Sequence, residues 1–151
     1  MDAMSLADLQ KLQGRWVQIR FEENGIVDPP DSHSTPGAVL TIEGCNFYVG
    51  VPGHRTILEG AFTLDARLLP KAITWVDAIG DDAGKPLPSI YDLSDGRFMF
   101  VAADEHMPRP TDFVGGAGLT LRSFVRAIRC KKMVRPQAAV FRLRQPSRDS
   151  V

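Results

Sequence analysis

A segment with a helical apolar pattern meets a segment with a strand pattern at Gly14-Arg15-Trp16. Residues 5–12 lead into this junction, and residues 17–21 leave it. A glycine allows the chain to turn tightly out of a helix, and the tryptophan that follows is large enough to plug one end of a small barrel. We therefore expect the remaining strands to be arranged around Trp16.

The segment before the junction is expected to form one short helix. Leu6, Leu9 and Leu12 recur at a helical step and make a single apolar stripe. Ser5 and Asp8, three residues apart, have the spacing of a capping box at the helix start. We expect this helix to close one end of the barrel.

The segment after the junction alternates apolar and polar side chains with a period of two. Val17, Ile19 and Phe21 share one face, whereas Trp16 falls on the opposite face among polar neighbours. Two arrangements would explain this pattern. Either a bulge near the start of the strand exchanges the faces, or Trp16 plugs a barrel with a partly polar lining while the other three side chains are covered from outside.

Further short runs with strand character follow, bounded by turn residues. Asp95-Gly96 between two such runs is the clearest hairpin signal. The expected strands cover residues 38–43, 46–51, 55–64, 72–77, 88–93, 97–102, 119–126 and 139–144. Eight or nine short strands, mostly linked by tight turns, predict an all-β fold: a single antiparallel up-and-down β-barrel with a short N-terminal helix.

The composition fits one globular domain of 151 residues, long enough to bury a real core. No apolar run approaches the roughly 18–20 residues that a membrane helix needs. Residues 1–13 lack the basic start and apolar centre of a signal peptide. With only Cys45 and Cys130 present, we expect two reduced thiols in a cytoplasmic protein that does not enter a membrane.

Charge is distributed unevenly along a chain whose net charge is zero. Residues 1–118 hold nine basic and 17 acidic side chains, and residues 119–151 hold nine basic side chains and one acidic one. We expect the arginines of the last strands to neutralise the acidic body. No zinc-ligand spacing or RNA-binding motif accompanies the basic end, so the sequence does not favour a nucleic-acid partner.

Five sequence blocks, taken in order, resemble a known family. Gly14-Arg15-Trp16 resembles the Gly-x-Trp signature of lipocalins and their calycin relatives. From Leu12 to about Arg126 the chain more specifically resembles a bacterial family of uncharacterised lipocalin-like domains. The blocks are residues 12–16, 24–25, 59–65 with 70–73, 90–93, and 109–113 with the glycines that follow. The resemblance implies a lipocalin-like barrel over residues 1–126, and carries no catalytic residue or substrate.

The resemblance also implies a cationic cap on the tryptophan, because lipocalins stack an arginine from the last strand on it. Arg122, Arg126, Arg142 and Arg144 are all candidates, and the sequence does not choose among them. Residues 127–151 extend beyond the family domain. We expect this basic C-terminal extension to contribute a last strand and a frayed tail.

The candidates for catalysis and metal binding do not converge. His33, His54 and His106 fall in expected loops, without the spacing that places ligands on one face of an element. Cys45 has no neighbouring base in the sequence to lower its pKa. We therefore expect a non-enzymatic protein without a metal or cofactor.

Binding is the remaining class of function, and its first form is a ligand inside the barrel. An eight-stranded barrel has room for about one small molecule. The expected lining of a small apolar ligand is Trp16, Phe47, Phe62, Trp75, Phe98, Phe100 and Arg122. In the alternative, these side chains simply fill the core.

The second form of binding is a protein partner on the outer surface. Val17, Ile19 and Phe21, if they point outward, would form the apolar centre of that contact or of a homodimer. An acidic body with a basic end suits a charge-matched partner, as in an immunity protein that holds a toxin. A cavity larger than a few water molecules would favour the ligand, and a filled barrel with an exposed apolar patch would favour the partner.

Overall fold

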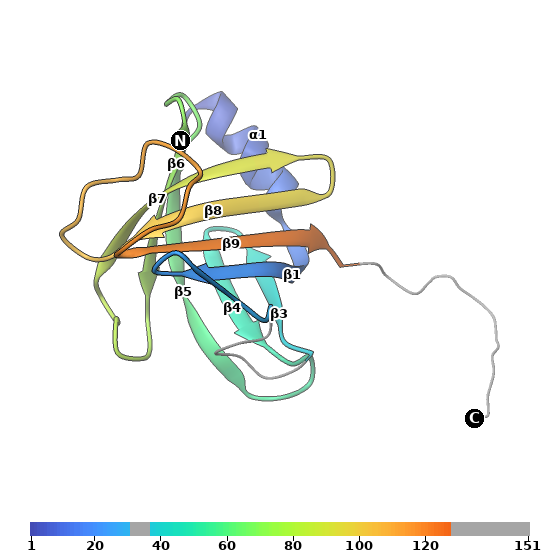
Figure 1. Cartoon of the computed structure of the whole chain (residues 1–151). Helices are drawn as coiled ribbons and strands as arrows, with labels where there is room; N and C mark the ends of the chain where they lie inside the picture. The colour runs from blue at the N-terminus through green and yellow to red at the C-terminus, as the bar shows by residue number, and fades with distance from the viewer. Residues whose placement is uncertain (31–36, 128–151) are drawn as a thin grey trace.

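Nine antiparallel strands and one helix make up the part of the chain that the computed structural model describes, residues 1–30 and 37–127 (Figure 1). The elements are α1 (Ala3–Leu12), β1 (Gly14–Glu23), β2 (Ile26–Asp28), β3 (Val39–Glu43), β4 (Asn46–Gly50), β5 (Thr56–Asp65), β6 (Lys71–Asp77), β7 (Pro86–Ser94), β8 (Arg97–Ala103) and β9 (Leu119–Arg126). The predicted all-β class and short N-terminal helix are confirmed. The expected strand over residues 139–144 and the proposed extension over 127–151 lie outside the described residues, apart from Ala127.

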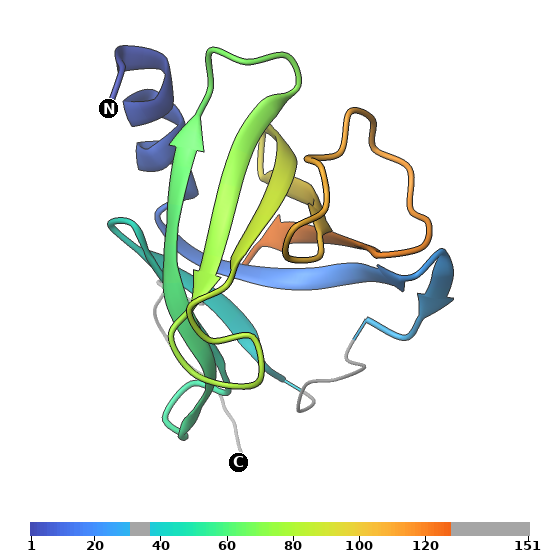
Figure 2. The same cartoon turned by 90° about the vertical axis from the view of Figure 1, so that its left-hand side faces the viewer.

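Pairing of the first and last strands closes the sheet into a barrel. From β3 to β9 each strand pairs with the next, and β9 returns to pair with β1 over Trp16–Glu23. The other edge of β1 is shared, because Gly14–Trp16 pair with β3 and Phe21–Glu23 pair with β2. The result is a closed barrel of eight strands with β2 as an additional strand (Figure 2), which is consistent with a lipocalin-like fold.

A bulge in β1 explains the mixed pattern of its side chains. The register with β9 shifts between Gln18 and Arg20, so the inward and outward faces exchange there. Before the bulge, Trp16 points into the barrel, and Val17 is 38% exposed. After it, Phe21 points inward and is only 1% exposed. The bulge therefore lies in the middle of the strand, and the expected outward stripe of three side chains does not form.

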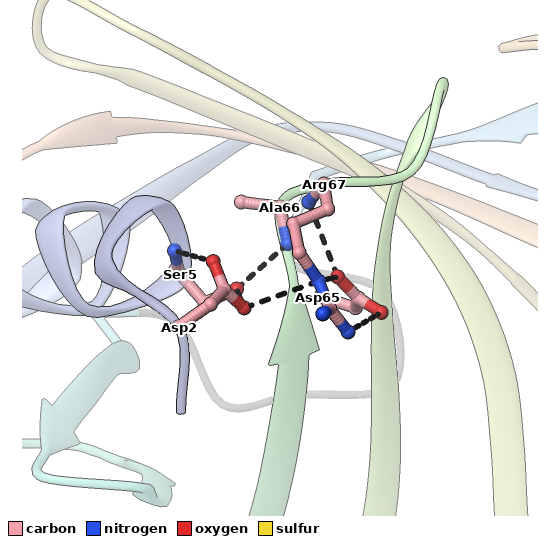
Figure 3. A network of polar contacts seen from close by, with 5 residues as sticks. All are labelled: Asp2, Ser5, Asp65, Ala66 and Arg67. Carbon is pink, nitrogen blue, oxygen red and sulfur yellow. Dashed lines mark hydrogen bonds and ion pairs between the residues drawn. The ribbon is translucent and has the colours of Figure 1, made fainter.

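The helix α1 begins three residues earlier than a cap at Ser5 would place it. Asp2 is the N-cap, and its carboxylate accepts hydrogen bonds from the backbone N–H and the hydroxyl of Ser5 (Figure 3). The Ser5 hydroxyl in turn accepts a hydrogen bond from the Ala66 N–H at 2.8 Å, which ties the helix to the end of β5. The expected capping box at Ser5 and Asp8 is therefore wrong. Both side chains are buried against the barrel instead.

An ion pair beside the cap adds a second link between α1 and the turn after β5. The Arg67 guanidinium lies 3.0 Å from the Asp65 carboxylate and 3.5 Å from that of Asp2 (Figure 3). These contacts lower the pKa of Asp65, and the hydrogen bonds from Ser5 lower that of Asp2. The expected stripe is corrected at Leu6, which is 46% exposed. Leu12 is buried and Leu9 packs against the core, as predicted, and the polar Ser5 and Asp8 share the buried face.

Trp16 plugs the end of the barrel that α1 covers. Its ring is fully buried, and its indole Nε1–H donates to the carbonyl of Leu12 at 2.8 Å. The Arg126 guanidinium lies 4.1 Å from the centre of the Trp16 ring. It also donates to the carbonyls of Lys11 and Gln13, at the C-terminal end of α1 where a cation is favoured. Of the four arginines that the sequence offered as candidates, Arg126 is therefore the one that caps Trp16.

Gly14 has two structural reasons to be a glycine. Its φ of +108° lies in a region that other residues rarely adopt. A Cβ atom at this position would lie 3.1 Å from the Arg126 guanidinium, so it would also disturb the cap. The Gly-x-Trp motif thus brings the turn at Gly14, the ring of Trp16 and the guanidinium of Arg126 together.

A buried polar cluster completes the same end of the barrel. The Asp8 carboxylate accepts hydrogen bonds from Lys71 Nζ at 2.9 Å and from the Tyr91 hydroxyl at 2.7 Å. Burial, together with the hydrogen bond and charge of Asp8, raises the pKa of Tyr91 well above its ordinary value of 10. We refer to the region around Trp16, Arg126 and this cluster as the sealed end.

A smaller apolar cluster lies outside the barrel, under the loop of residues 104–118. Ile90, Val101 and Leu121 come from three neighbouring strands, and Phe113 packs on them from the loop. Arg109 fixes the same loop by donating to the carbonyls of Ile73 and Ser89 at 2.9 and 2.7 Å. The residue block 109–113 therefore has an anchoring role in the fold.

No helix within residues 1–30 and 37–127 has the length and apolar character needed to cross a bilayer.

Candidate functional site

The barrel is packed in one half and hollow in the other. Towards α1, the Phe98 ring packs against Trp16 with the ring centres 5.8 Å apart, and it also contacts Tyr91 and Phe124. Towards the other end, where β6 and β8 finish and β7 and β9 begin, a cavity of about 340 Å³ remains. At about 30 Å³ for each water molecule of a liquid, this space exceeds a few waters severalfold.

The cavity has an apolar interior and a polar mouth. Aromatic and aliphatic side chains form its interior: Leu40, Phe47, Val49, Leu58, Trp75, Leu87, Phe100, Ala102 and Phe124. Polar and charged side chains also line it: Gln18, Glu23, Asp77, Asp82, Asp104, Thr120 and Arg122. Asp82 and Asp104 are exposed to solvent, so the cavity opens at this end, which we call the open end.

Trp75 stands at the boundary between the packed and hollow halves. It lines the cavity, and its ring also contacts Phe62 and Phe98 of the packed half. The Phe100 ring lies closest, with the ring centres 4.9 Å apart. The Trp75 Nε1 atom is buried without a hydrogen-bond partner, alone in this respect among side-chain nitrogen and oxygen atoms of the described residues. An unpaired buried N–H costs about 1–3 kcal/mol, so this donor stands out in a core that otherwise satisfies its polar side chains.

Arg122 places a positive charge inside the barrel. Its guanidinium lies 4.3 Å from the centre of the Phe21 ring and donates to the Gln18 side-chain oxygen at 2.8 Å. Burial lowers the pKa of Arg122, while the charges of Glu23 and Asp77 oppose that shift. The guanidinium thus already has an aromatic face, an acceptor and two nearby negative charges.

Asp77 is a half-buried carboxylate on the inward face of β6, two residues after Trp75. Burial raises its pKa, the charge of Asp82 raises it further, and Arg122 acts in the opposite direction. Among the described residues, its carboxylate has no hydrogen bond and no ion pair within 4 Å. The negative charge of Asp77 is therefore only partly compensated.

The structure separates the predicted lining residues into two groups. Phe47, Trp75, Phe100 and Arg122 line the cavity. Trp16, Phe62 and Phe98 belong to the packed half. Of the seven predicted residues, four therefore line a cavity and three fill the core.

The predicted partner-binding stripe is interrupted. Val17 and Ile19 are exposed on the outer face of β1, at 38% and 43%. Phe21 lies inside the barrel under Arg122, because the bulge reverses its direction. Two separate exposed apolar side chains are common on ordinary protein surfaces.

The acidic residues of the open end were missed at the sequence level. A signal for Asp77 was present, because it continues the inward face of a predicted strand two positions after Trp75. Glu23, Asp82 and Asp104 carried no such signal, since they lie at a strand end or in turns. Their convergence depends on which strand ends meet in the closed barrel.

The candidates for catalysis lie apart from the cavity. His54 and His106 are exposed, Cys45 is half-buried in the turn between β3 and β4, and none of them lines the cavity. His33 and Cys130 lie outside the described residues. Within the described ranges, no group of three or more His, Cys, Asp and Glu side chains is arranged to hold a metal ion.

Comparison of the chain with family models, with curated proteins and with solved structures gives no match. The barrel and its cavity are therefore interpreted from their own geometry.

Proposed function

We propose that this chain is a non-enzymatic, lipocalin-like binding protein that holds a small, largely apolar ligand in the open end of its barrel. The observation that carries the proposal is the cavity of about 340 Å³, which falls in the size range of small-molecule sites. Its aromatic and aliphatic interior matches the usual lining of such sites, and its polar and charged side chains can orient a ligand. Membership of the bacterial family of lipocalin-like domains is part of the same proposal, and rests on the five sequence blocks.

A fluorescent titration tests the proposal. N-phenyl-1-naphthylamine is neutral, apolar and weakly fluorescent in water, and its emission rises in an apolar site. We expect saturable binding by the intact protein at one site per chain. Absence of saturable emission, or binding of several molecules with equal weak affinity, would contradict the proposal.

A matched pair of variants locates the site of that binding. Ala102 lines the cavity, and Ala102→Phe fills part of it. Ala61 is exposed on the outer face of β5, so Ala61→Phe adds the same side chain outside the barrel. We expect the first variant to lose at least about tenfold in affinity and the second to bind like the unmodified protein. Equal affinities in the two variants, both folded by circular dichroism, would place the probe elsewhere.

The alternative function, an immunity or inhibitor protein with a protein partner or a second copy on its surface, has less support. Of the three side chains predicted to form its contact surface, Phe21 lies inside the barrel, and Val17 and Ile19 are exposed. The observed cavity is the feature expected for a ligand, whereas a filled barrel was expected for a partner. The alternative remains a prediction from the charge distribution of the sequence.

A further inference from the structure

The open end of the barrel carries more negative than positive charge. Four carboxylates line the cavity, those of Glu23, Asp77, Asp82 and Asp104. Among residues 1–30 and 37–127, Arg122 is the one cationic side chain that lines it. Lys85 reaches Asp82 from outside at 3.8 Å, but both side chains are exposed, and such a pair contributes little. The mouth thus has an excess of negative charge directly above an apolar interior.

Asp77 is one carboxylate of this group whose charge is only partly compensated. It is half-buried, and no described cation lies within 4 Å of its carboxylate. Asp82 adds a second negative charge near it, and this repulsion acts together with burial to disfavour the ionised form. A positive group placed between these carboxylates would relieve both effects.

Trp75 gives an independent indication that the cavity is built to be occupied. Its side chain is 94% buried and lines the cavity, and its Nε1–H has no partner. The corresponding N–H of Trp16, at the sealed end, is satisfied by a backbone carbonyl. A buried donor without a partner is rare in folded proteins and calls for an explanation, and a group that enters the adjoining cavity on binding would supply one.

We propose that the ligand is a cationic amphiphile, an organic ammonium or guanidinium compound with an apolar body. The positive head lies at the mouth beside Asp77 and Asp82, and the body lies against Phe47, Trp75 and Phe100. This inference rests on the proposed function, since it requires the cavity to be a ligand site. It adds the chemical class of the ligand.

An anionic head bound by Arg122 is the competing arrangement. The guanidinium already donates to Gln18 and stacks on Phe21, and its charge is opposed by Glu23 and Asp77. An anion would also approach Arg122 through a mouth lined by four carboxylates, and like charges at short range are unfavourable. The charge balance therefore favours a cation.

Three competitors with the same alkyl chain distinguish a cationic head group from a neutral or an anionic one. Decylammonium, decanol and decanoate are each used, below their aggregation concentrations, to displace N-phenyl-1-naphthylamine from the full chain at pH 7. We expect decylammonium to bind about tenfold more tightly than decanol, and decanoate to bind more weakly than decanol. Equal affinities, or a preference for decanoate, would overturn the inference while leaving the proposed function intact. Failure of the fluorescent probe itself to bind would instead contradict the proposed function.

Two isosteric variants test whether the preference for a cationic head group arises at the mouth of the cavity. Asp77→Asn removes the charge of Asp77 with little change in shape, and Asp92→Asn does the same on the exposed outer face of β7. We expect Asp77→Asn to lose most of the tenfold preference for decylammonium over decanol and to change the affinity for decanol less than threefold. Asp92→Asn should keep both affinities. If Asp77→Asn retains the full preference, the proposed position of the head is wrong.

Discussion

At the sealed end of the barrel, the buried polar side chains have found partners within the protein, whereas at the open end some have not. The indole N–H of Trp16 donates to a helix carbonyl, and Asp8 holds Lys71 and Tyr91 at hydrogen-bond distance. The indole N–H of Trp75 has no partner, and the charge of Asp77 is only partly compensated. The same eight strands thus support a region organised for stability and a region left incomplete, as expected of a site that a ligand completes.

The two arginines of β9 show the same contrast four residues apart. Arg126 stacks on Trp16 and binds carbonyls at the end of α1, where the helix dipole favours its charge. Arg122 stacks on Phe21 inside the barrel and donates to the side-chain oxygen of Gln18. Burial lowers the pKa of both arginines, so the two differ in their partners: Arg126 binds the end of the helix, and Arg122 lines the cavity.

Matched substitutions of the two tryptophans give the largest expected difference between the ends. Trp16→Phe removes a buried hydrogen bond, leaves the Leu12 carbonyl without a side-chain donor and opens a small void, so we expect the free energy of unfolding to fall by about 2–3 kcal/mol. Trp75→Phe removes an N–H that has no partner, and the loss should stay below about 1 kcal/mol. Urea unfolding of both variants measures the difference. Equal losses would mean that the ends do not differ as described.

Matched substitutions of the two arginines should give a smaller difference. Arg126→Met loses the stacking on Trp16 and two hydrogen bonds to carbonyls, for an expected loss of about 1–2 kcal/mol. Arg122→Met removes a desolvated charge, which favours the variant, but it also takes the donor from the Gln18 oxygen and the positive charge from near Glu23 and Asp77. These effects oppose each other, so the net loss should be smaller than that of Arg126→Met. Thermal and urea unfolding test this. A larger loss in Arg122→Met than in Arg126→Met would reverse the assignment.

The two tyrosines provide a test of the sealed end by pH. The pKa of Tyr91 is raised in the folded protein, so the folded state keeps a proton that the unfolded state loses. Its contribution to stability is complete below pH 10, the unfolded value, and is lost as the pH rises above it. The fall in stability between pH 9 and pH 11 should therefore be smaller in Tyr91→Phe than in the unmodified protein. Tyr48→Phe, on the outer face of β4, is the control and should leave the fall unchanged.

The smallest expected effect concerns Asp77 at the open end. Its pKa is raised in the folded protein, so the folded state favours the protonated form, and ionisation at neutral pH opposes folding slightly. We therefore expect Asp77→Asn to raise Tm a little at pH 7, and the gain to shrink as the pH falls towards 4. Differential scanning calorimetry at both values measures it. A lower Tm at pH 7 would show that the carboxylate is part of the stable framework.

The strands could be predicted from the sequence because period-two alternation and turn residues are local signals. The expected strand over residues 119–126 coincides with β9, and the hairpins around Gly44 and Asp95-Gly96 form as predicted. The short strand β2 was missed, since three residues carry no measurable period. The helix cap was misplaced because Asp2 and Ser5 both fit the position, and only the contact with Ala66 distinguishes them.

The site was less predictable, because it depends on how distant strand ends meet. Arg126 rather than Arg122 caps Trp16 because the register of β9 against β1 pairs Arg126 directly with Trp16. The faces of the strands could be read from alternation, and this identified Phe47, Trp75 and Phe100. Alternation does not show which half of a barrel its side chains fill, so the cavity and the carboxylates at its mouth required the folded arrangement.

The two tryptophans, one in each region, allow the most direct test of the central claim. Each indole N–H gives its own signal in a ¹H–¹⁵N correlation spectrum, and Trp75→Phe assigns them. On titration with decylammonium, the Trp75 signal should move progressively to saturation, while the Trp16 signal should stay within a small fraction of that shift. Movement of the Trp16 signal by a comparable amount, or of neither signal at saturating ligand, would contradict the division of the barrel into a sealed end and a ligand-binding open end.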